Sequence, residues 1–264
     1  MNGTYPELER RWKRLRGDGW SVREVACVGA PRTLICAERG DHTLPSIAIA
    51  AGVHGDEPAG PWALLELVES GGLDPAFSYR LWPCTNPTGF DARTRESADG
   101  LDLNRTFGRG GQSPEAKAIL TANRDRKFEL SIDLHEDADA TGFYCYEYGG
   151  GDDGRRVVAA LDAAGLPVDP LQATFETAGP MDDTSCTRER GRITADHRAE
   201  AALLGSLSYS LAIARNAARR ALTFETPSRA SWDLRLSMHR LAVRAAIASI
   251  SQGEGKVARE TMFE

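Results

Sequence analysis

Four polar residues of this chain have the types and spacing that metal-assisted hydrolysis needs. His54 and Glu57 are three residues apart, directly after an apolar segment. His135 ends a second apolar segment, and Glu225 ends a third. Two histidines and one carboxylate are the ligands of a catalytic zinc ion that keeps one position open, and an additional Glu beside such an ion is the usual general base. The pattern therefore predicts a zinc site that catalyses hydrolysis.

Each of these signals has a plainer interpretation when it is taken singly. A His and a Glu three residues apart occur often by chance, as a surface histidine and a helix-capping acid. His135 lies in an acidic stretch, residues 133–137, that also suits a solvated turn. Glu225 could cap a helix or form an ion pair before Pro227, although a carboxylate at the end of a buried strand needs a partner or a task. Their joint occurrence favours one site.

The elements that must position these residues are predicted strands alternating with helices. Residues 45–53, 128–134 and 221–224 are predicted buried strands, because they are mostly apolar and bounded by turn-forming or polar residues. The alternation indicates a single α/β domain over residues 1–264, with a twisted, mostly parallel mixed sheet and helices on both faces. Polar residues at strand ends gather where such folds bind ligands.

Other segments complete this expected organisation. Residues 86–111 are rich in Gly, Asp, Arg and Asn and are predicted to be a long loop that carries function. Residues 174–196 show little regular structure and suit a lid or a pocket rim. Further strands are expected at 23–28, 33–37, 79–83 and 143–148, and helices at 58–70, 113–126, 155–164, 199–218 and 231–251.

Composition and charge exclude several classes of protein. The 264 residues are 41% hydrophobic and 27% charged, which is ordinary for a globular domain. The net charge of −6 gives no support to nucleic-acid binding, which usually shows a basic stripe. No apolar run reaches the roughly 18–20 residues of a membrane span, and the N-terminus lacks a signal pattern. The five cysteines are scattered without a C-x-x-C pair, so we expect reduced thiols and a cytoplasmic location.

Two short motifs flank Arg95 and suggest how a substrate would be held. Asn86-Pro87-Thr88-Gly89 precedes it, and Asp102-Leu103-Asn104-Arg105 follows it. An Arg beside an Asn offers a fork of donors suited to a carboxylate. A surface charge is the plainer interpretation of each Arg.

In this order the motifs resemble those of the zinc carboxypeptidases related to carboxypeptidase A. The family pattern is H-x-x-E, N-P-D-G, an Arg, D-x-N-R, a strand-end His and a late strand-end Glu. The match runs from His54 to Glu225, about two thirds of the chain, with Thr88 in place of the usual Asp. The resemblance implies a sheet of about eight strands, in the compact bacterial branch of the family. That family is related to the aspartoacylases and succinylglutamate desuccinylases.

The resemblance also implies a role for each catalytic residue. His54, Glu57 and His135 would bind one zinc ion per chain and leave a position for water. Glu225 would take a proton from that water and pass it to the leaving amine. Arg95 would stabilise the oxyanion of the tetrahedral intermediate.

Further residues would hold the substrate and orient the ligands. Asn104 and Arg105 would bind the free carboxylate of the terminal residue, and Asp102 would accept a hydrogen bond from the far ring nitrogen of His54. Family members also use a mobile tyrosine over the substrate. Its candidates in this chain are Tyr146, Tyr148 and Tyr209.

The leading hypothesis is a zinc metallocarboxypeptidase that removes one C-terminal residue from a peptide or a murein-type peptide. The alternative is an amidohydrolase of the aspartoacylase and succinylglutamate desuccinylase type, which shares the zinc ligands and D-x-N-R and cleaves small N-acyl amino acids. Asn86-Pro87-Thr88-Gly89 and Glu225-Thr226-Pro227 favour the peptidase. A non-catalytic binding domain is a third hypothesis, and a serine hydrolase is disfavoured because no G-x-S-x-G turn is present. The specificity pocket is expected between Glu147 and Glu225.

Overall fold

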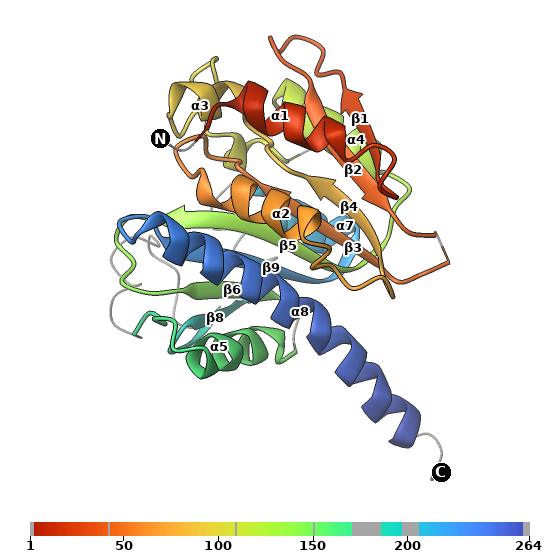
Figure 1. Cartoon of the computed structure of the whole chain (residues 1–264), viewed down its shortest axis with the longest axis vertical. Helices are drawn as coiled ribbons and strands as arrows, with labels where there is room; N and C mark the ends of the chain where they lie inside the picture. The colour runs from red at the N-terminus through yellow and green to blue at the C-terminus, as the bar shows by residue number, and fades with distance from the viewer. Residues whose placement is uncertain are drawn as a thin grey trace.

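A mixed sheet of nine strands runs through the molecule (Figure 1), and two of its strands carry His135 and Glu225. The computed structural model describes residues 3–41, 43–108, 110–149, 151–170, 186–196 and 206–260. The strand order is β1-β2-β4-β3-β5-β9-β6-β8-β7. The strands are β1 (Ser21–Val25), β2 (Leu34–Arg39), β3 (Ser46–Ala51), β4 (Ser78–Trp82), β5 (Phe128–Asp137), β6 (Tyr144–Tyr148), β7 (Cys186–Glu189), β8 (Arg192–Ala195) and β9 (Ala218–Pro227).

The four central strands are parallel, and this arrangement brings their carboxyl ends to one edge. β4, β3, β5 and β9 form the parallel centre, in which Ala51 pairs with Leu134 and His135 pairs with Glu225. β1, β2 and β6 join antiparallel, β8 runs parallel to β6, and β7 returns antiparallel. Half of the strand pairs are therefore parallel, and the expected parallel character holds for the centre of the sheet.

Helices cover both faces of this sheet, as expected for an α/β fold. In Figure 1, α1, α2, α5 and α8 lie in front of the strands, and α4 and α7 lie behind them. Each layer of helices buries its own apolar core against the sheet. Trp12 and Leu65 in the front core, and Trp82 and Tyr209 in the rear core, are fully buried. The helices are α1 (Tyr5–Arg14), α2 (Ala59–Glu69), α3 (Pro87–Ala92), α4 (Pro114–Asn123), α5 (Asp153–Ala163), α7 (Tyr209–Asn216) and α8 (Trp232–Glu260), with a 3₁₀ turn at Leu103–Arg105.

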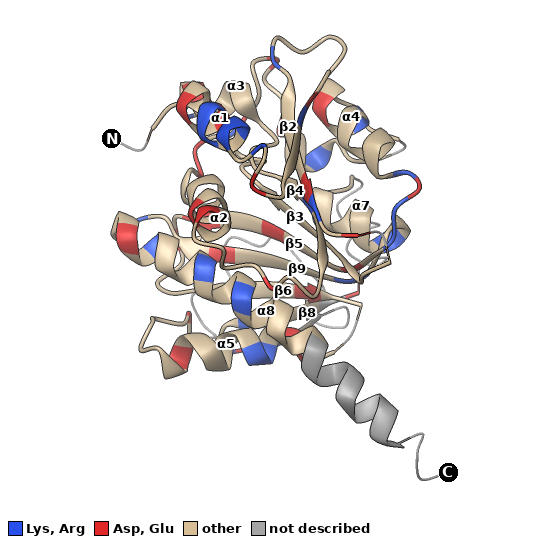
Figure 2. Ribbon diagram, turned by 45° about the vertical axis from the view of Figure 1, so that its right-hand side comes forward, with Lys and Arg blue, Asp and Glu red and all other residues tan. Residues whose placement is uncertain are grey.

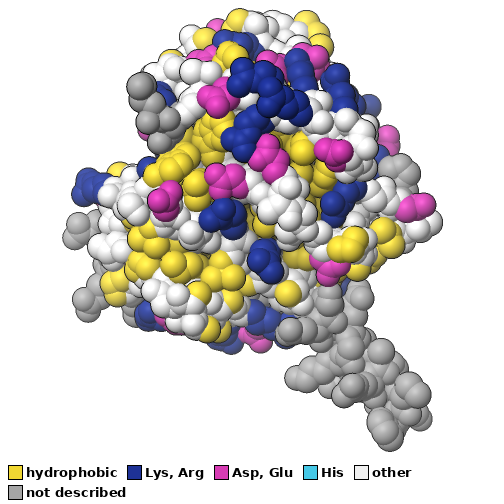
Figure 3. Space-filling model, in the orientation of Figure 1, with side chains coloured by type: hydrophobic (Ala, Val, Ile, Leu, Met, Phe, Trp, Pro, Cys, Tyr) yellow, Lys and Arg dark blue, Asp and Glu magenta, His cyan; other side chains and the backbone are white. Residues whose placement is uncertain are grey.

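Charged side chains lie mainly on the helices and loops around this core. Figure 2 shows Lys and Arg along α1 and α8, whereas the central strands carry few charges. In the space-filling view of the same side as Figure 1, basic side chains gather over α1, and acidic and hydrophobic side chains are interspersed below them (Figure 3). None of the described helices combines the length and apolarity that a membrane crossing requires.

The structure contains two strands that the sequence analysis did not predict. β7 and β8 lie within residues 174–196, which we expected to have little regular structure. Each has four residues and includes charged side chains, so neither shows an apolar pattern. β8 forms because it pairs with β6, and β7 forms on β8. With these two strands the sheet has nine strands, where the resemblance implied about eight. Residues 171–185 lie outside the described part of the chain.

Two further expectations about local structure were only partly correct. Residues 86–111, predicted to be a loop, contain two short helical elements. One is α3, whose first turn is capped by the Asn86 side chain, and the other is the 3₁₀ turn at Leu103–Arg105. The helix predicted at 199–218 is described only from Tyr209 to Asn216, and residues 197–205 lie outside the described part. Ala218 instead begins β9 and pairs with Phe128, so strand pairing overrides the helix propensity of this alanine- and arginine-rich stretch.

Candidate active site

The three predicted zinc ligands lie together at the carboxyl edge of the parallel strands. His54 follows β3, and His135 lies near the end of the neighbouring strand β5. Nδ1 of His54 lies 2.6 Å from Oε1 of Glu57, and Nδ1 of His135 lies 2.9 Å from Oε2 of the same carboxylate. All three side chains are buried, and their ligand atoms lie within 4.8 Å of one another. This donor set fits a single zinc ion.

A close backbone contact holds the turn that carries His54 and Glu57. A Cβ added to Gly55 would lie 1.9 Å from the carbonyl carbon of Gly89 in α3, so only glycine allows the two segments to approach. Asn86 caps α3 by accepting a hydrogen bond from the Gly89 N–H, and it also donates to the Arg95 carbonyl. The motif Asn86-Pro87-Thr88-Gly89 thus fastens the metal-binding turn to the loop that carries Arg95.

Each ligand histidine has a second carboxylate on its far ring nitrogen. Nε2 of His54 lies 3.3 Å from Oδ1 of Asp102, and Nε2 of His135 lies 3.0 Å from Oδ2 of Asp133. Such a carboxylate fixes the ring orientation and the tautomer that presents Nδ1 to a metal. The structure therefore places Asp102 where the sequence analysis expected it. The structure also places Asp133 beside His135. The sequence could have indicated this contact, because residues two apart on a strand share a face.

The carboxylates around the two histidines carry negative charge that a bound cation would balance. Burial by itself would lower the pKa of His135, but Asp133 and Glu57 outweigh it and raise that pKa well above its ordinary value. The pKa of His54 is raised as well, because Glu57 and Asp102 outweigh its burial. Burial would raise the pKa of Glu57, yet the two histidines hold it below the ordinary range. A zinc ion would take the place of the imidazole protons in balancing these carboxylates.

Arg95 lies beside the ligands, held by the same aspartate that contacts His54. Its Nε and Nη2 donate to Oδ2 of Asp102 at 3.2 and 3.0 Å. Its Nη1 lies 3.3 Å from Nδ1 of His54 and 3.8 Å from Oε1 of Glu57. The Arg95 side chain is 41% exposed, so it can still meet a ligand in the pocket.

Asn104 and Arg105 line the same pocket, although they make different contacts. Oδ1 of Asn104 accepts the Tyr209 N–H at the start of α7 at 3.0 Å, so this side chain braces a helix. Arg105 is exposed, and its Nη1 donates to the carbonyl of Asn104. The contact with Tyr209 uses only the oxygen of the Asn104 amide, so both Asn104 and Arg105 can offer N–H donors to a carboxylate in the pocket.

Glu225 faces the metal ligands from the neighbouring strand. It is the register partner of His135, it lines the pocket, and its carboxylate has no hydrogen-bond partner among the described residues. Burial and the nearby carboxylates of Glu57, Asp137 and Asp133 raise its pKa well above the ordinary value, against the effect of His135. A carboxyl group in this position can hold or release a proton beside a bound cation.

Glu136, next to His135, anchors the end of β5 to two helices. Its Oε1 accepts the Ala59 N–H at the start of α2, and its Oε2 accepts from Arg235 of α8. Burial raises the pKa of Glu136 to about 6, despite these donors. The sequence analysis gave this residue no role, because no local pattern shows which distant groups a carboxylate will meet.

The pocket that contains these residues also has three tyrosines in its wall. It holds about 420 Å³ and is lined by Tyr144, Tyr146 and Tyr148 of β6. Tyr209 is fully buried and packs edge-to-face on Phe107, so it is not available as a tyrosine over the substrate. All the pocket tyrosines stand on a strand. The specificity pocket expected between Glu147 and Glu225 stays a prediction; of the residues in that range, Tyr148, Ser208, Ser210 and Thr223 line this cavity.

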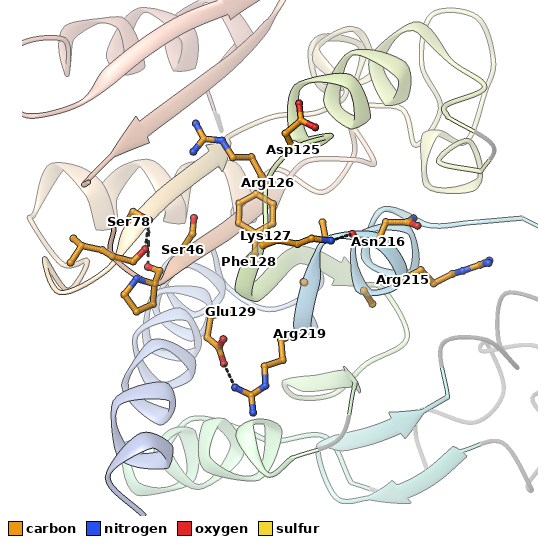
Figure 4. Close-up of a pocket in the computed structure, with 15 residues that line it drawn as sticks. Ser46, Ser78, Asp125, Arg126, Lys127, Phe128, Glu129, Arg215, Asn216 and Arg219 are labelled. Atoms are coloured by element: carbon orange, nitrogen blue, oxygen red, sulfur yellow. Dashed lines mark hydrogen bonds and ion pairs between the residues drawn. The ribbon is translucent and has the colours of Figure 1, made fainter. Parts of the chain in front are cut away.

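A second hollow of about 770 Å³ lies at the opposite edge, where the parallel strands begin (Figure 4). Lys127 donates to the carbonyl of Asn216 at the end of α7, and Arg219 pairs with Glu129. Cations are favourable beside the carboxyl end of a helix. The basic residues of this hollow therefore have a structural explanation, and the predicted site residues all lie elsewhere.

Comparison with known proteins places these features in a family. The model of the succinylglutamate desuccinylase/aspartoacylase catalytic domain matches residues 43–225. Carboxypeptidase SOL1 of Arabidopsis thaliana is 34% identical in an alignment of length 119 that covers 38% of this chain and 24% of that protein. The chain thus spans about a quarter of the length of this curated relative.

Solved structures share the fold over most of this chain. A candidate metallopeptidase from Shewanella denitrificans OS217 is 26% identical, with a TM-score of 0.68, covering 93% of this chain and 88% of that chain. Carboxypeptidase A from Helicoverpa armigera is 16% identical, with a TM-score of 0.61, covering 93% and 74%. The triad His54, Glu57 and His135 is typical of a carboxypeptidase zinc site. With its nine-stranded sheet resembling that of carboxypeptidase A, the chain belongs to the succinylglutamate desuccinylase/aspartoacylase catalytic-domain family.

Proposed function

We propose that this protein is a zinc-dependent hydrolase that cleaves an amide bond close to a free carboxylate. Its leading candidate substrate is a peptide, which it would cleave at the C-terminal amide bond. The observation that carries the proposal is the meeting of three ligands, Glu225 and Arg95 around one pocket. The similarity to carboxypeptidase SOL1 and to carboxypeptidase structures supports the peptide substrate.

The ligand set would hold the metal at the reacting bond. Zinc bound by His54, Glu57 and His135 would polarise the scissile carbonyl and lower the pKa of water. Asp102 and Asp133 keep the two imidazoles turned so that both Nδ1 atoms face the same point. These contacts reduce the reorganisation needed when the metal binds.

Glu225 would act as general base and then as general acid. In the first step its carboxylate takes a proton from the attacking water, and in the second it delivers that proton to the leaving nitrogen. Arg95 would donate to the oxygen that gains negative charge as the carbonyl becomes tetrahedral. Arg105, braced through Asn104, would bind the free carboxylate and set which amide bond reaches Glu225.

A small N-acyl amino acid is the second candidate substrate, and the family match favours it. The matching domain model is named for succinylglutamate desuccinylase and aspartoacylase. These substrates also carry a free carboxylate beside the scissile amide, so the same residues would serve. The two candidates differ in the acyl side: a peptide needs an open path for a long chain, whereas a small acyl group does not.

The deciding experiment is product analysis by mass spectrometry with the zinc-loaded protein. One sample contains a mixed peptide library, and the other contains N-succinylglutamate, N-acetylaspartate and other N-acyl amino acids. The Glu225→Gln variant, loaded with the same amount of zinc, is the control. Release of single C-terminal residues supports the carboxypeptidase, and release of free amino acid only from the second sample supports the deacylase. Intact substrates in both samples, at full zinc content, would contradict the proposal.

A further inference from the structure

Reciprocal hydrogen bonds join the end of β5 to the segment that carries Glu57. Oε2 of Glu57 lies 2.9 Å from Nδ1 of His135 and accepts the backbone N–H of Glu136 at 3.1 Å. In return, Oε1 of Glu136 accepts the N–H of Ala59, two residues after Glu57, at 2.7 Å. The Glu136 backbone therefore contacts a ligand atom directly, while its side chain holds the residues that follow this ligand.

The first turn of α2 depends on Glu136 for its cap. Pro58 occupies the N-cap position, and its ring has no acceptor for the free N–H groups at the start of the helix. The residues of this turn, 59–62, are Ala, Gly, Pro and Trp, so none of them is acidic. The Glu136 carboxylate supplies from β5 the negative charge and the acceptor that a helix N-terminus favours. A strand residue thus determines where α2 begins.

Close packing holds α2 against β5 at the same point. A Cβ added to Gly60 would lie 2.9 Å from Cβ of Leu134 and 3.1 Å from its carbonyl oxygen. Leu134 precedes His135, and Gly60 follows Glu57 by three residues. The separation between these two ligand-bearing segments is therefore determined by a backbone contact as well as by Glu136.

Arg235 of α8 holds the Glu136 carboxylate from its other side. Its Nη1 donates to Oε2 of Glu136, and the two side chains are 12% and 0% exposed. The Arg235 guanidinium in turn lies over the ring of Trp232, one turn earlier in α8, with Cζ 5.1 Å from the ring centroid. A fully buried carboxylate needs such a counter-charge. The bridge therefore links β5, α2 and α8, and both helices lie on the front face of the sheet (Figure 1).

A second buried bridge of the same kind shows what such an arrangement does when it is only structural. Glu147 of β6 accepts the N–H groups of Asp153 and Gly154 at the start of α5, and it pairs with Nε of Arg192 at 2.6 Å. Neither Glu147 nor Arg192 belongs to the described lining of the pocket around the metal ligands. The bridge of Glu136 differs because its strand also contacts a ligand carboxylate.

We propose that Glu136, held by Arg235, is a positioning residue for the zinc site, because it keeps the Glu57 carboxylate between His54 and His135. This inference rests on the zinc site of the proposed function and not on its substrate. Groups that orient metal ligands typically contribute about 10–100-fold to metal affinity. Loss of the bridge should therefore weaken zinc binding and alter the arrangement of the ligands in a folded protein.

The test removes the whole bridge, so that no unpaired charge stays buried. The double variant Glu136→Leu/Arg235→Met is compared with wild type and with the matched control Glu147→Leu/Arg192→Met. Buried ion pairs replaced by apolar residues of similar volume are often tolerated. The zinc dissociation constant is measured by competition with a chelator, under conditions in which circular dichroism shows each protein to be fully folded. We expect it to rise about 10-fold or more in the first variant and to stay within about 2-fold of wild type in the control.

Visible absorption of the cobalt-substituted proteins provides a second readout, because the ligand-field bands of Co²⁺ depend on the geometry of its ligands. The bands should change in position or intensity in the first variant and match wild type in the control. If the first variant does not fold, Glu136→Gln is measured in the same two assays against Glu147→Gln, with the same expected directions.

The outcomes separate this inference from the proposed function. Unchanged zinc affinity and cobalt bands in the Glu136 variant, or an equal loss in the control, would overturn the positioning role. A wild-type protein that binds no zinc would overturn both this inference and the proposed function. Zinc affinity that falls as expected, in a protein that turns over no substrate, would support the positioning role while the proposed function fails.

Discussion

Glu225 and His135 are register partners on the adjacent parallel strands β9 and β5. The strand pairing itself therefore sets the separation between the proposed base and a metal ligand, without help from a loop. Catalytic groups on paired strands are held more rigidly than groups on loops. This relationship makes Glu225 the group whose replacement should separate metal binding from turnover.

Glu225→Gln should bind zinc normally and lose most of its turnover. The amide keeps the size of the side chain, but it cannot accept a proton from water, and a general base typically contributes about 10²–10⁴-fold to the rate. Zinc content after dialysis and kcat on the best substrate measure the two effects. A variant with near-wild-type kcat would remove Glu225 from the mechanism.

Asp133→Asn should weaken zinc binding by about 10–100-fold, because Asp133 orients His135 through its far ring nitrogen. The dissociation constant is measured by competition with a chelator of known affinity. Asp169→Asn is a matched control, since Asp169 is another buried aspartate and it accepts hydrogen bonds from Thr141, outside the pocket. Equal zinc affinities for the two variants would show that Asp133 has no orienting role.

Zinc affinity should rise with pH across the neutral range. The carboxylates around them raise the pKa of both His54 and His135, so these imidazoles retain their protons to higher pH than usual and must release them to bind zinc. Each proton released changes the apparent affinity by up to about 10-fold per pH unit. Calorimetry at one pH in two buffers of different ionisation enthalpy counts these protons, and a count near zero would contradict the prediction.

His239 should make the zinc-free protein less stable in acid. It is fully buried in α8, with Nε2 3.1 Å from Oγ1 of Thr226, and burial lowers its pKa from 6.5 to about 3. In acid, His239 therefore binds a proton in the unfolded chain but not in the folded one. The contribution of the neutral, buried His239 to the free energy of unfolding is fully present above pH 6.5. It is lost as the pH falls toward 3, by up to about 1.4 kcal/mol per pH unit.

Urea unfolding of wild type and His239→Gln between pH 7 and pH 4 measures this effect. The free energy of unfolding of the variant should fall less steeply, because Gln does not titrate. Parallel pH profiles for the two proteins would exclude His239 as the source of acid sensitivity.

Arg105→Ala should raise KM for substrates with a free carboxylate, by about 10-fold, and should change KM little for their amides. Arg105 is exposed in the pocket and pairs only with a backbone carbonyl in the described structure, so its loss should cost little stability. Steady-state kinetics on matched acid and amide substrates measure the difference. Equal changes in KM for both would refute the anchoring role.

The cluster of His54, Glu57 and His135 was predictable because its signals are local. A spacing of three residues brings His54 and Glu57 into one turn, and His135 and Glu225 lie beside each other because their strands are parallel and adjacent. Asp133 could have been found by the same two-residue alternation that links it to His135. The order of the motifs was sufficient to indicate the relationship to the carboxypeptidases.

Only the tertiary structure shows which distant segments meet these residues. The contacts of Glu136 with Ala59 and Arg235, and of Asn104 with Tyr209, join elements far apart in the chain. The position of the β6 tyrosines beside Glu225 depends on the antiparallel pairing of β6 with β9. β8 pairs with the other edge of β6, and β7 pairs with β8. Strand order and register arise from the packing of the whole sheet, so no pattern within one segment contains them.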